Sequence, residues 1–262
     1  MPQNNLKAMT NEQILEIAMT AGKILLCSGA ETYRVEDTML RMCAARGLHT
    51  VSAFCTPSVL IVSAEGAEGN TCVYRVINRN TDLSLVSEIS DISFKFSHWP
   101  YDYKETMAIL KSKADKPLRA PYVDVICAGI GAAAFTLMLG GDTSEASAAF
   151  VASLLAMWVV KIFSPFKPSA FWSTAIAGAV LCGVTLLFKQ MVPGTSMELV
   201  IAGAIMPYVP GMPFTNGLRD YMAGDLISGN SRVSEAILLV MALVVGIAAV
   251  LGIASKFGLI YH

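Results

Sequence analysis

The stretch MPYVPGMPFTNGLRDYMAGD, residues 206–225, combines three prolines with polar and charged side chains in a strongly apolar part of the chain. Asn216, Arg219 and Asp220 are spaced i, i+3 and i+4, so one helix face can present an amide, a guanidinium and a carboxylate together. A guanidinium can hold a carboxylate through two hydrogen bonds, and a carboxylate can bind an ammonium or a proton. The spacing therefore predicts a site for a small charged metabolite. An ordinary interfacial Arg–Asp pair at a helix end is the alternative.

The prolines of this stretch predict an interrupted helix. Pro207, Pro210 and Pro213 have no N–H to donate, so each leaves the carbonyl four residues back without its helical partner. Beside hydrocarbon, such carbonyls need partners from neighbouring helices or must line a water-filled cavity. Discontinuous helices of this kind bind substrates and ions in many secondary transporters. A simple bend that neighbouring helices satisfy is the other interpretation.

The charges of the chain are distributed unevenly. Of the 19 Lys/Arg and 20 Asp/Glu among 262 residues, 26 lie in the first 120 residues and 13 in the remaining 142. Because an average soluble domain carries about 25% charged residues, we predict a soluble domain over 1–115 and a membrane domain over 116–262. Neither part is basic enough to indicate binding of nucleic acid.

The first of these domains has the mixed periodicity of an α+β fold. The patterns T-N-E-Q at Thr10 and S-G-A-E at Ser28 are predicted to be capping boxes that open two helices. Runs rich in β-branched residues, separated by turn residues, then predict three short strands. The expected elements are helices over 10–26 and 31–47, strands over 48–56, 58–66 and 71–80, and helices over 82–96 and 101–114.

The second domain contains five apolar segments of about the 20 residues that a helix needs to cross a bilayer. They cover about 121–140, 145–163, 170–188, 198–217 and 233–255. Positive residues are concentrated on one side of these spans. This bias predicts a cytoplasmic N-terminal domain and a periplasmic C-terminus. The eight positive residues of the inner side are Lys111, Lys113, Lys116, Arg119, Lys161, Lys167, Arg219 and Arg232, against Lys189 and Lys256 outside.

The motifs of familiar enzymes and metal sites are missing from the sequence. It contains no CxxC, Walker A, GxSxG or HExxH motif, and its six cysteines and three histidines have no metal-ligand spacing. We therefore expect no catalytic residue, no metal and no cofactor. The charged stretch SGAETYRVEDTM, residues 28–39, is explained as the solvated face of a helix.

Two motifs in combination resemble the threonine/serine exporter family, and the resemblance extends over about residues 12–251. The first motif is G-x-E-x-x-R-V-E, which is formed here by Gly29, Glu31, Arg34, Val35 and Glu36. The second is P-x-x-P-G…T-N-x-x-R-D…A-G-D…S-G. Its residues here are Pro207, Pro210, Gly211, Thr215, Asn216, Arg219, Asp220, Gly224, Asp225 and Gly229.

The resemblance implies a secondary exporter in the bacterial inner membrane. Full-length members of the family look like two fused membrane halves of about five spans each, and this chain is similar to the first half with its cytoplasmic domain. It resembles the larger subunit of a split version, in which a small integral-membrane partner supplies the second half. One such pair is associated with export of succinate. The implied partners are the lipid bilayer, that small subunit and a small-molecule substrate, either threonine/serine or a C4-dicarboxylate.

Within this interpretation the residues of the second motif have separate roles in binding. Arg219 takes the substrate carboxylate, Thr215 and Asn216 hydrogen-bond it, and Asp220 or Asp225 couples protons. Pro207, Pro210 and Gly211 open the backbone of the fourth span at the same place. The alternative is a membrane-anchored regulatory or scaffold subunit whose cytoplasmic domain senses a metabolite.

Overall fold

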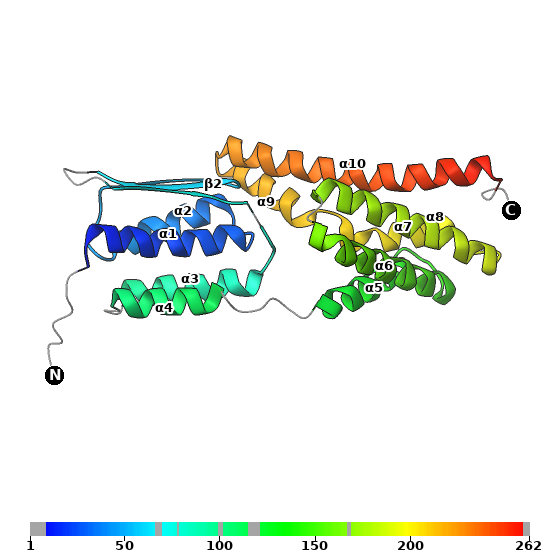
Figure 1. The fold of residues 1–262 in the computed structure, drawn as a ribbon, viewed down its shortest axis with the longest axis horizontal. Coiled ribbons are helices and arrows are strands. Elements are labelled where there is room, and N and C mark those ends of the chain that lie inside the picture. The colour runs from blue at the N-terminus through cyan, green and yellow to red at the C-terminus, as the bar shows by residue number, and fades with distance from the viewer. Residues whose placement is uncertain are drawn as a thin grey trace. The chain divides into compact units, whose positions relative to one another are not determined.

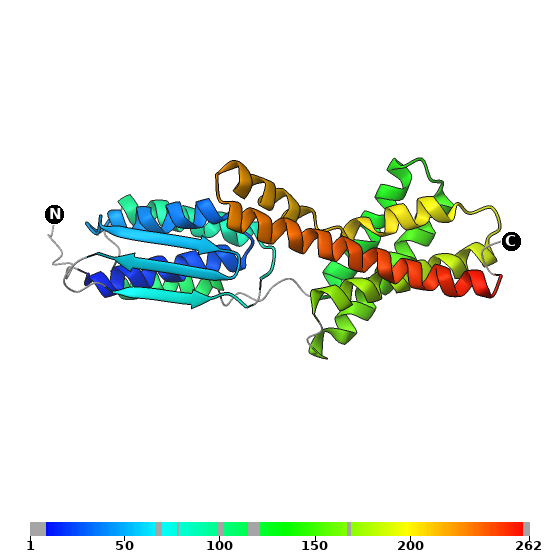
Figure 2. The same ribbon diagram turned by 90° about the horizontal axis from the view of Figure 1, so that it is seen from above.

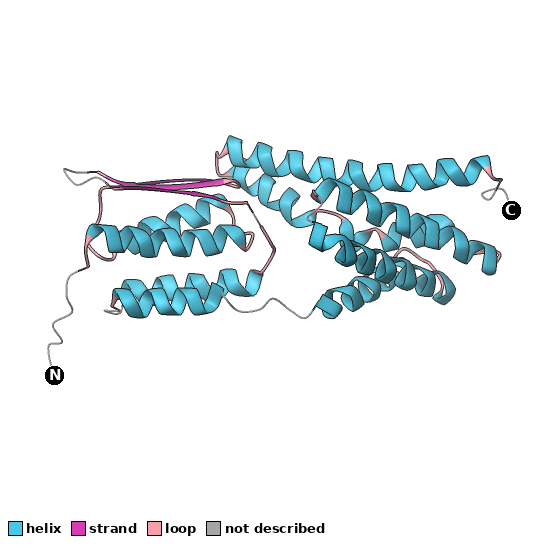
Figure 3. Cartoon of the chain, in the orientation of Figure 1, coloured by secondary structure: helices cyan, strands magenta, loops and turns pink. Residues whose placement is uncertain are grey.

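A computed structural model describes residues 9–65, 70–77, 79–98, 102–114, 121–166 and 169–258. Helices dominate it, together with one small antiparallel sheet (Figure 1, Figure 3). The chain separates into two compact units, Met1–Lys116 with Met212–Ser234 and Pro117–Gly211 with Glu235–His262. The elements are α1 (Asn11–Cys27), α2 (Thr32–Ala44), β1 (Val51–Thr56), β2 (Val59–Ala64), β3 (Thr71–Arg75), α3 (Leu83–His98), α4 (Tyr103–Ala114), α5 (Pro121–Met138), α6 (Thr143–Phe163), η1 (Ser164–Phe166), α7 (Ala170–Met191), α8 (Met197–Ala204), η2 (Met206–Tyr208), α9 (Gly211–Met222) and α10 (Leu226–Lys256).

The first unit is built in layers on a three-stranded antiparallel sheet of order β1-β2-β3, which confirms the three predicted strands. Alternate residues of β2, such as Leu60 and Val62, are buried, as expected for a sheet with one covered face. Helices α1 and α2 pack on that face, and α3 and α4 form a further layer behind them (Figure 1). Figure 2 looks onto the sheet with these helices behind it.

Local hydrogen bonds and one glycine set where helix α1 begins and ends. The capping box predicted at Thr10 is present, since Thr10 and Gln13 exchange side chain-to-backbone hydrogen bonds. The second predicted capping box, at Ser28, is wrong. Ser28 is the C-cap of α1, and Gly29 follows with a φ of 87°, a left-handed conformation that ends the helix. Helix α2 therefore begins only after Glu31, whose side chain makes no capping hydrogen bond.

The second unit is a bundle of α5, α6, α7 and α8 with the greater part of α10. Small side chains fill its core, so the helix backbones approach closely, as is typical of packing in lipid. Helices α7 and α10 are one such pair. A Cβ atom at Gly246 would overlap the carbonyl oxygen of Ala175, and one at Gly178 would overlap that of Leu243.

Three helices of the described residues are long and apolar enough to cross a membrane: Thr143–Phe166, Ala170–Met191 and Leu226–Lys256. They correspond to three of the five predicted spans. The predicted fourth span is interrupted, and Met197–Tyr208 qualifies only together with Gly211–Met222. The predicted first span is a shorter apolar helix, Tyr122–Met138.

Some of the sequence predictions fall outside the described residues. Lys116, Arg119 and Lys167, which contribute to the predicted orientation, are among them, and so is the predicted domain boundary between 115 and 116. The division of the sequence into 1–115 and 116–262 stays a prediction. By their contacts, residues 212–234 belong to the first compact unit.

The close approach of α7 and α10 predicts that Gly246→Ala destabilises the protein. The added methyl group meets the backbone of α7 and the two helices must separate, a cost of about 1–3 kcal/mol for overpacking. Thermal unfolding of the detergent-solubilised chain should show a lowered midpoint. Gly252→Ala on the same helix is the control, because no atom lies within 4 Å of its added Cβ. Equal midpoints for the two variants would contradict the close packing.

Candidate functional site

The turn between α1 and α2, residues 29–32, is the centre of the candidate site. Its shape follows from the end of α1, where the N–H of Gly29 bonds to the carbonyl of Leu26 and the N–H of Ala30 to that of Leu25. This paired pattern closes a helix that ends on a left-handed glycine. The next backbone and side-chain groups, up to Thr32, then face α9 and the start of α10 within the same unit.

Four polar side chains of α9 and α10 each contact one residue of this turn. Asn216 donates from Nδ2 to the carbonyl of Gly29 (2.9 Å), and Arg232 donates from Nη2 to the carbonyl of Ala30 (2.8 Å). The other two contacts involve charges. Arg219 Nη1 lies 2.5 Å from Glu31 Oε1, and Asp220 Oδ1 accepts hydrogen bonds from Thr32, at 2.7 Å from Oγ1 and 3.3 Å from N. The two sequence motifs therefore meet in one interface.

Helix α9 can present these side chains because two glycines let it pack tightly against the start of α10. A Cβ atom at Gly217 would lie 2.8 Å from the side chain of Val233. One at Gly229 would lie 2.6 Å from the ring of Tyr221. The connection between the helices turns at Gly224, whose φ is 88°. Any larger residue at these positions would move the polar side chains away from the turn.

The charges of the site differ strongly in burial. Asp220 is fully buried and Arg232 is 6% exposed, with Asp220 Oδ2 and Arg232 Nε 3.0 Å apart. These two atoms are not aligned for a hydrogen bond to each other or to any other described group, so the contact is an electrostatic pair. The Arg219 side chain, in contrast, is 58% exposed while its partner Glu31 is 11% exposed. The site therefore has one buried ion pair and one that solvent reaches.

Two further carboxylates lie beside the buried pair. Glu36 accepts a hydrogen bond from the N–H of Cys55 (2.7 Å), and Asp225 begins α10 by accepting from the N–H of Ser228 (3.1 Å). Burial raises the pKa of the Glu36 carboxyl above its ordinary value, against the hydrogen bond from Cys55, and the negative charges of Asp225 and Asp220 raise it further. Ser228 also donates to the carbonyl of Cys55 (3.3 Å). Helices α2 and α10 therefore both bind β1 at Cys55.

Some residues of the two motifs lie elsewhere. Arg34 points to α3, where it donates to Ser90 (2.9 Å), and Val35 is buried in the core of the first unit. Thr215 lies on the exposed side of α9. Pro207 and Pro210 belong to the second unit, in η2 and just after it.

The carbonyls freed by these prolines are partly satisfied within the chain. The N–H of Val209 bonds to the carbonyl of Met206 (3.3 Å), and the N–H of Gly211 bonds to the carbonyl of Val209 (2.8 Å). The backbone thus replaces the lost helical bonds with tighter local turns. Each carbonyl oxygen retains a second lone pair that can accept from a ligand or a neighbouring group.

Sequence reasoning missed three members of the interface. Sequence reasoning gave no role to Thr32, Ser228 or the carbonyl of Cys55, and it counted Arg232 only among the charges that orient the spans. The signal that could have indicated Arg232 is its position. Arg232 directly precedes the predicted span over 233–255, and an arginine at the edge of hydrocarbon needs a carboxylate partner or must reach water.

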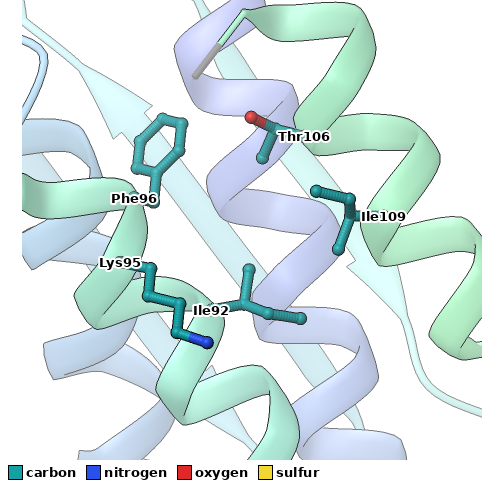
Figure 4. A pocket seen from close by; sticks show the side chains of 5 residues that line it. All are labelled: Ile92, Lys95, Phe96, Thr106 and Ile109. Carbon is teal, nitrogen blue, oxygen red and sulfur yellow. The ribbon is translucent and has the colours of Figure 1, made fainter. Parts of the chain in front are cut away.

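No group of three or more His, Cys, Asp or Glu among the described residues is placed to hold a metal ion. Figure 4 shows a small hollow between α3 and α4 that is lined by Ile92, Lys95, Phe96, Thr106 and Ile109. Its volume of about 30 Å³ is close to that of one water molecule. The hollow is too small for a metabolite.

The apolar helices define the chain as a multi-pass membrane protein. The profile of the family described as "Putative threonine/serine exporter" matches residues 16–254, which is most of the sequence. The chain belongs to this threonine/serine exporter family, a family of transporters and not a class of enzymes.

Three curated relatives show how the chain compares in length. It is 25% identical over 239 residues to the "Probable succinate transporter subunit YjjP" of Klebsiella aerogenes, covering 89% of this chain and 91% of the relative. The protein of the same name from Escherichia coli K12 is 25% identical over 245 residues, covering 92% and 94%. The "Probable threonine/serine exporter" of Mycobacterium tuberculosis is 22% identical over 242 residues, covering 90% of this chain but 45% of the relative. No solved structure matches the chain.

The buried pair of the site predicts that Asp220→Ala strongly destabilises the protein. The change leaves Arg232 charged, buried and without its carboxylate, which typically costs about 3–5 kcal/mol. Thermal unfolding of the full chain in detergent should show a large loss, whereas Glu31→Ala, which breaks the exposed pair, should cost at most about 1 kcal/mol. The double variant Asp220→Ala/Arg232→Ala should recover part of the loss. If the loss in the double variant equalled the sum of the losses from Asp220→Ala and Arg232→Ala alone, the two charges would not be coupled.

Proposed function

We propose that this chain is the larger subunit of a two-component secondary exporter for small carboxylate-bearing metabolites. The observation that carries the proposal is length. The chain aligns with 91% and 94% of two proteins named as transporter subunits, but with 45% of an exporter that is about twice as long. A second, small integral-membrane subunit would supply what the longer exporter carries in one chain. The substrate is threonine/serine or a C4-dicarboxylate such as succinate.

The proposed arrangement in the membrane follows the sequence pattern. Five spans cross the inner membrane of a bacterium, with the N-terminal domain in the cytoplasm and the C-terminus in the periplasm. The three long apolar helices support three of these spans, and the interrupted pair Met197–Tyr208 and Gly211–Met222 supports a fourth. The shorter helix Tyr122–Met138 is the remaining one.

Within this exporter, Arg219 is the residue best placed to take the substrate carboxylate. Its guanidinium has five N–H donors in a planar fork, and the bond to Glu31 occupies one nitrogen, Nη1. Its exposure makes that bond weak and open to competition by another carboxylate. Thr215 lies on the exposed side of the same helix. Together they form the accessible part of the proposed substrate site.

Asn216, Asp220 and Asp225 have a second role in the proposal. Asn216 and Asp220 are occupied by the turn at residues 29–32, so they can contact a substrate only when α9 and the turn separate. Asp220 or Asp225 would then exchange a proton. Pro207, Pro210 and Gly211 would contribute backbone groups where the span is interrupted.

A regulatory or scaffold subunit is the second candidate, and one observation favours it. The polar side chains of α9 are used to hold the N-terminal fold, as they would be in a protein that reports the state of a cytoplasmic domain. The two candidates differ in one respect that can be measured. A scaffold moves no substrate.

Transport should require both subunits. Inside-out vesicles from a strain that lacks both components should take up labelled threonine, serine or succinate when this chain and the small subunit are produced together. Vesicles with either chain alone should not. Full uptake by this chain alone would show that it is self-sufficient. Failure of the assembled pair to move any of the three substrates would favour the scaffold.

Arg219→Lys separates a substrate role from an anchoring role. Lysine keeps the charge but loses the planar fork that grips a carboxylate through two hydrogen bonds, so uptake should fall strongly at normal abundance. The control is Arg41→Lys, which changes an arginine paired with Asp37 on α2 of the same unit and should leave uptake unchanged. Normal uptake by Arg219→Lys would remove Arg219 from the substrate site, since lysine anchors a helix end equally well.

A further inference from the structure

Helix α9 has the reverse polarity of a helix on the surface of a soluble protein. The residues of α9 that are buried against the first unit are Asn216, Gly217 and Asp220. Three of its large apolar residues are exposed: Phe214 at 46%, Leu218 at 44% and Met222 at 88%. A helix of a soluble domain buries its apolar stripe and exposes its polar face.

The exposed apolar residues of α9 form a continuous stripe. Phe214, Leu218 and Met222 are four residues apart and therefore lie one above the other on the helix surface. Leu226 and Ile227, both 65% exposed, follow in the first turn of α10. We call these five residues the α9 stripe. Contiguous exposed apolar surface of this kind marks a site of contact with a membrane or another molecule.

We infer that the α9 stripe contacts the acyl chains of the lipid bilayer. The segments before and after α9 in the sequence indicate that the stripe contacts lipid. The segment Met197–Tyr208 precedes α9 and shares a candidate span with it, and α10, which begins at Leu226, is the most apolar candidate span of the described residues. Further large apolar residues along α10, such as Leu238 and Met241, are likewise exposed. The stripe thus begins and ends in segments with lipid-facing composition.

The length of α9 fits contact with the bilayer from one side. Its 12 residues rise about 18 Å, which is well short of the roughly 30 Å hydrocarbon core. Arg219 lies beside the stripe with a long side chain that can reach the headgroup region while its stem stays near the acyl chains. In this position the apolar side of α9 is in lipid, and its polar side holds the turn at residues 29–32. The helix therefore fixes the N-terminal fold to the membrane surface.

Photo-crosslinking from the stripe tests the inference without any measurement of transport. Benzoylphenylalanine is placed at Phe214 or at Met222 in the full chain, and membrane vesicles of the producing cells are irradiated. Mass spectrometry should identify phospholipid adducts as the main product at both positions. Asp91, an exposed residue of α3, is the control position and should give none.

Two results would overturn the inference. A main product with another protein would make the stripe a protein interface, with a second copy of this chain or a different chain distinguished by mass. Absence of adducts at both positions, in protein that reaches the membrane at normal abundance, would place the stripe in water. Met222 is exposed enough to tolerate the probe if Phe214 does not. Because lipid adducts form whether or not a substrate is moved, failure of the proposed function leaves this result intact.

Discussion

The buried ion pair between Asp220 and Arg232 is the interaction on which the candidate site depends. A charge removed from water is tolerated only when an opposite charge and hydrogen bonds replace its hydration. Here Thr32 donates twice to the Asp220 carboxylate, and Arg232 donates to the carbonyl of Ala30. Separation of the turn from these helices therefore removes hydrogen bonds from both buried charges, which must then find water or new partners. This constraint makes residues 212–234 part of the first unit, although the sequence places them between membrane segments.

The second ion pair of the site has the opposite character. Arg219 and Glu31 are held by a bond that solvent reaches, and exposed pairs contribute about 0–1 kcal/mol. The interface thus combines a buried pair that fixes geometry with a second pair whose guanidinium remains open to solvent. In the proposed exporter, this division lets one part of α9 exchange ligands while another part holds the fold.

Much of the first unit could be predicted from its sequence because its signals are local. Thr10 and Gln13 form the capping box that their spacing predicts, and the three strand-forming runs are strands. The prediction at Ser28 failed because Gly29, in a left-handed conformation, closes α1 at this point, so that Ser28 is the C-cap of α1.

The site was only half predictable for a related reason. The i, i+3, i+4 spacing placed Asn216, Arg219 and Asp220 on one face, and all three do contact one turn. The identity of that turn has no local signal, since Thr32 is 188 residues from Asp220. The resemblance to a family brought the two motifs together in one chain, but it did not say that they touch. The membrane spans could likewise be predicted well for α6, α7 and α10, where apolar runs are uninterrupted. They were harder to predict where prolines divide the chain.

The division of the first unit between two distant parts of the sequence also imposes an order on its biogenesis. Residues 117–211, which include α5 to α8, are synthesised after the sheet and α1 to α4 but before α9. During that interval the turn at residues 29–32 has none of its four partners, and Glu31 and Thr32 are left to water. Contacts of such long sequence separation form late, because the intervening chain must first be arranged. The N-terminal fold can therefore close only after the membrane segments that precede α9 have been made.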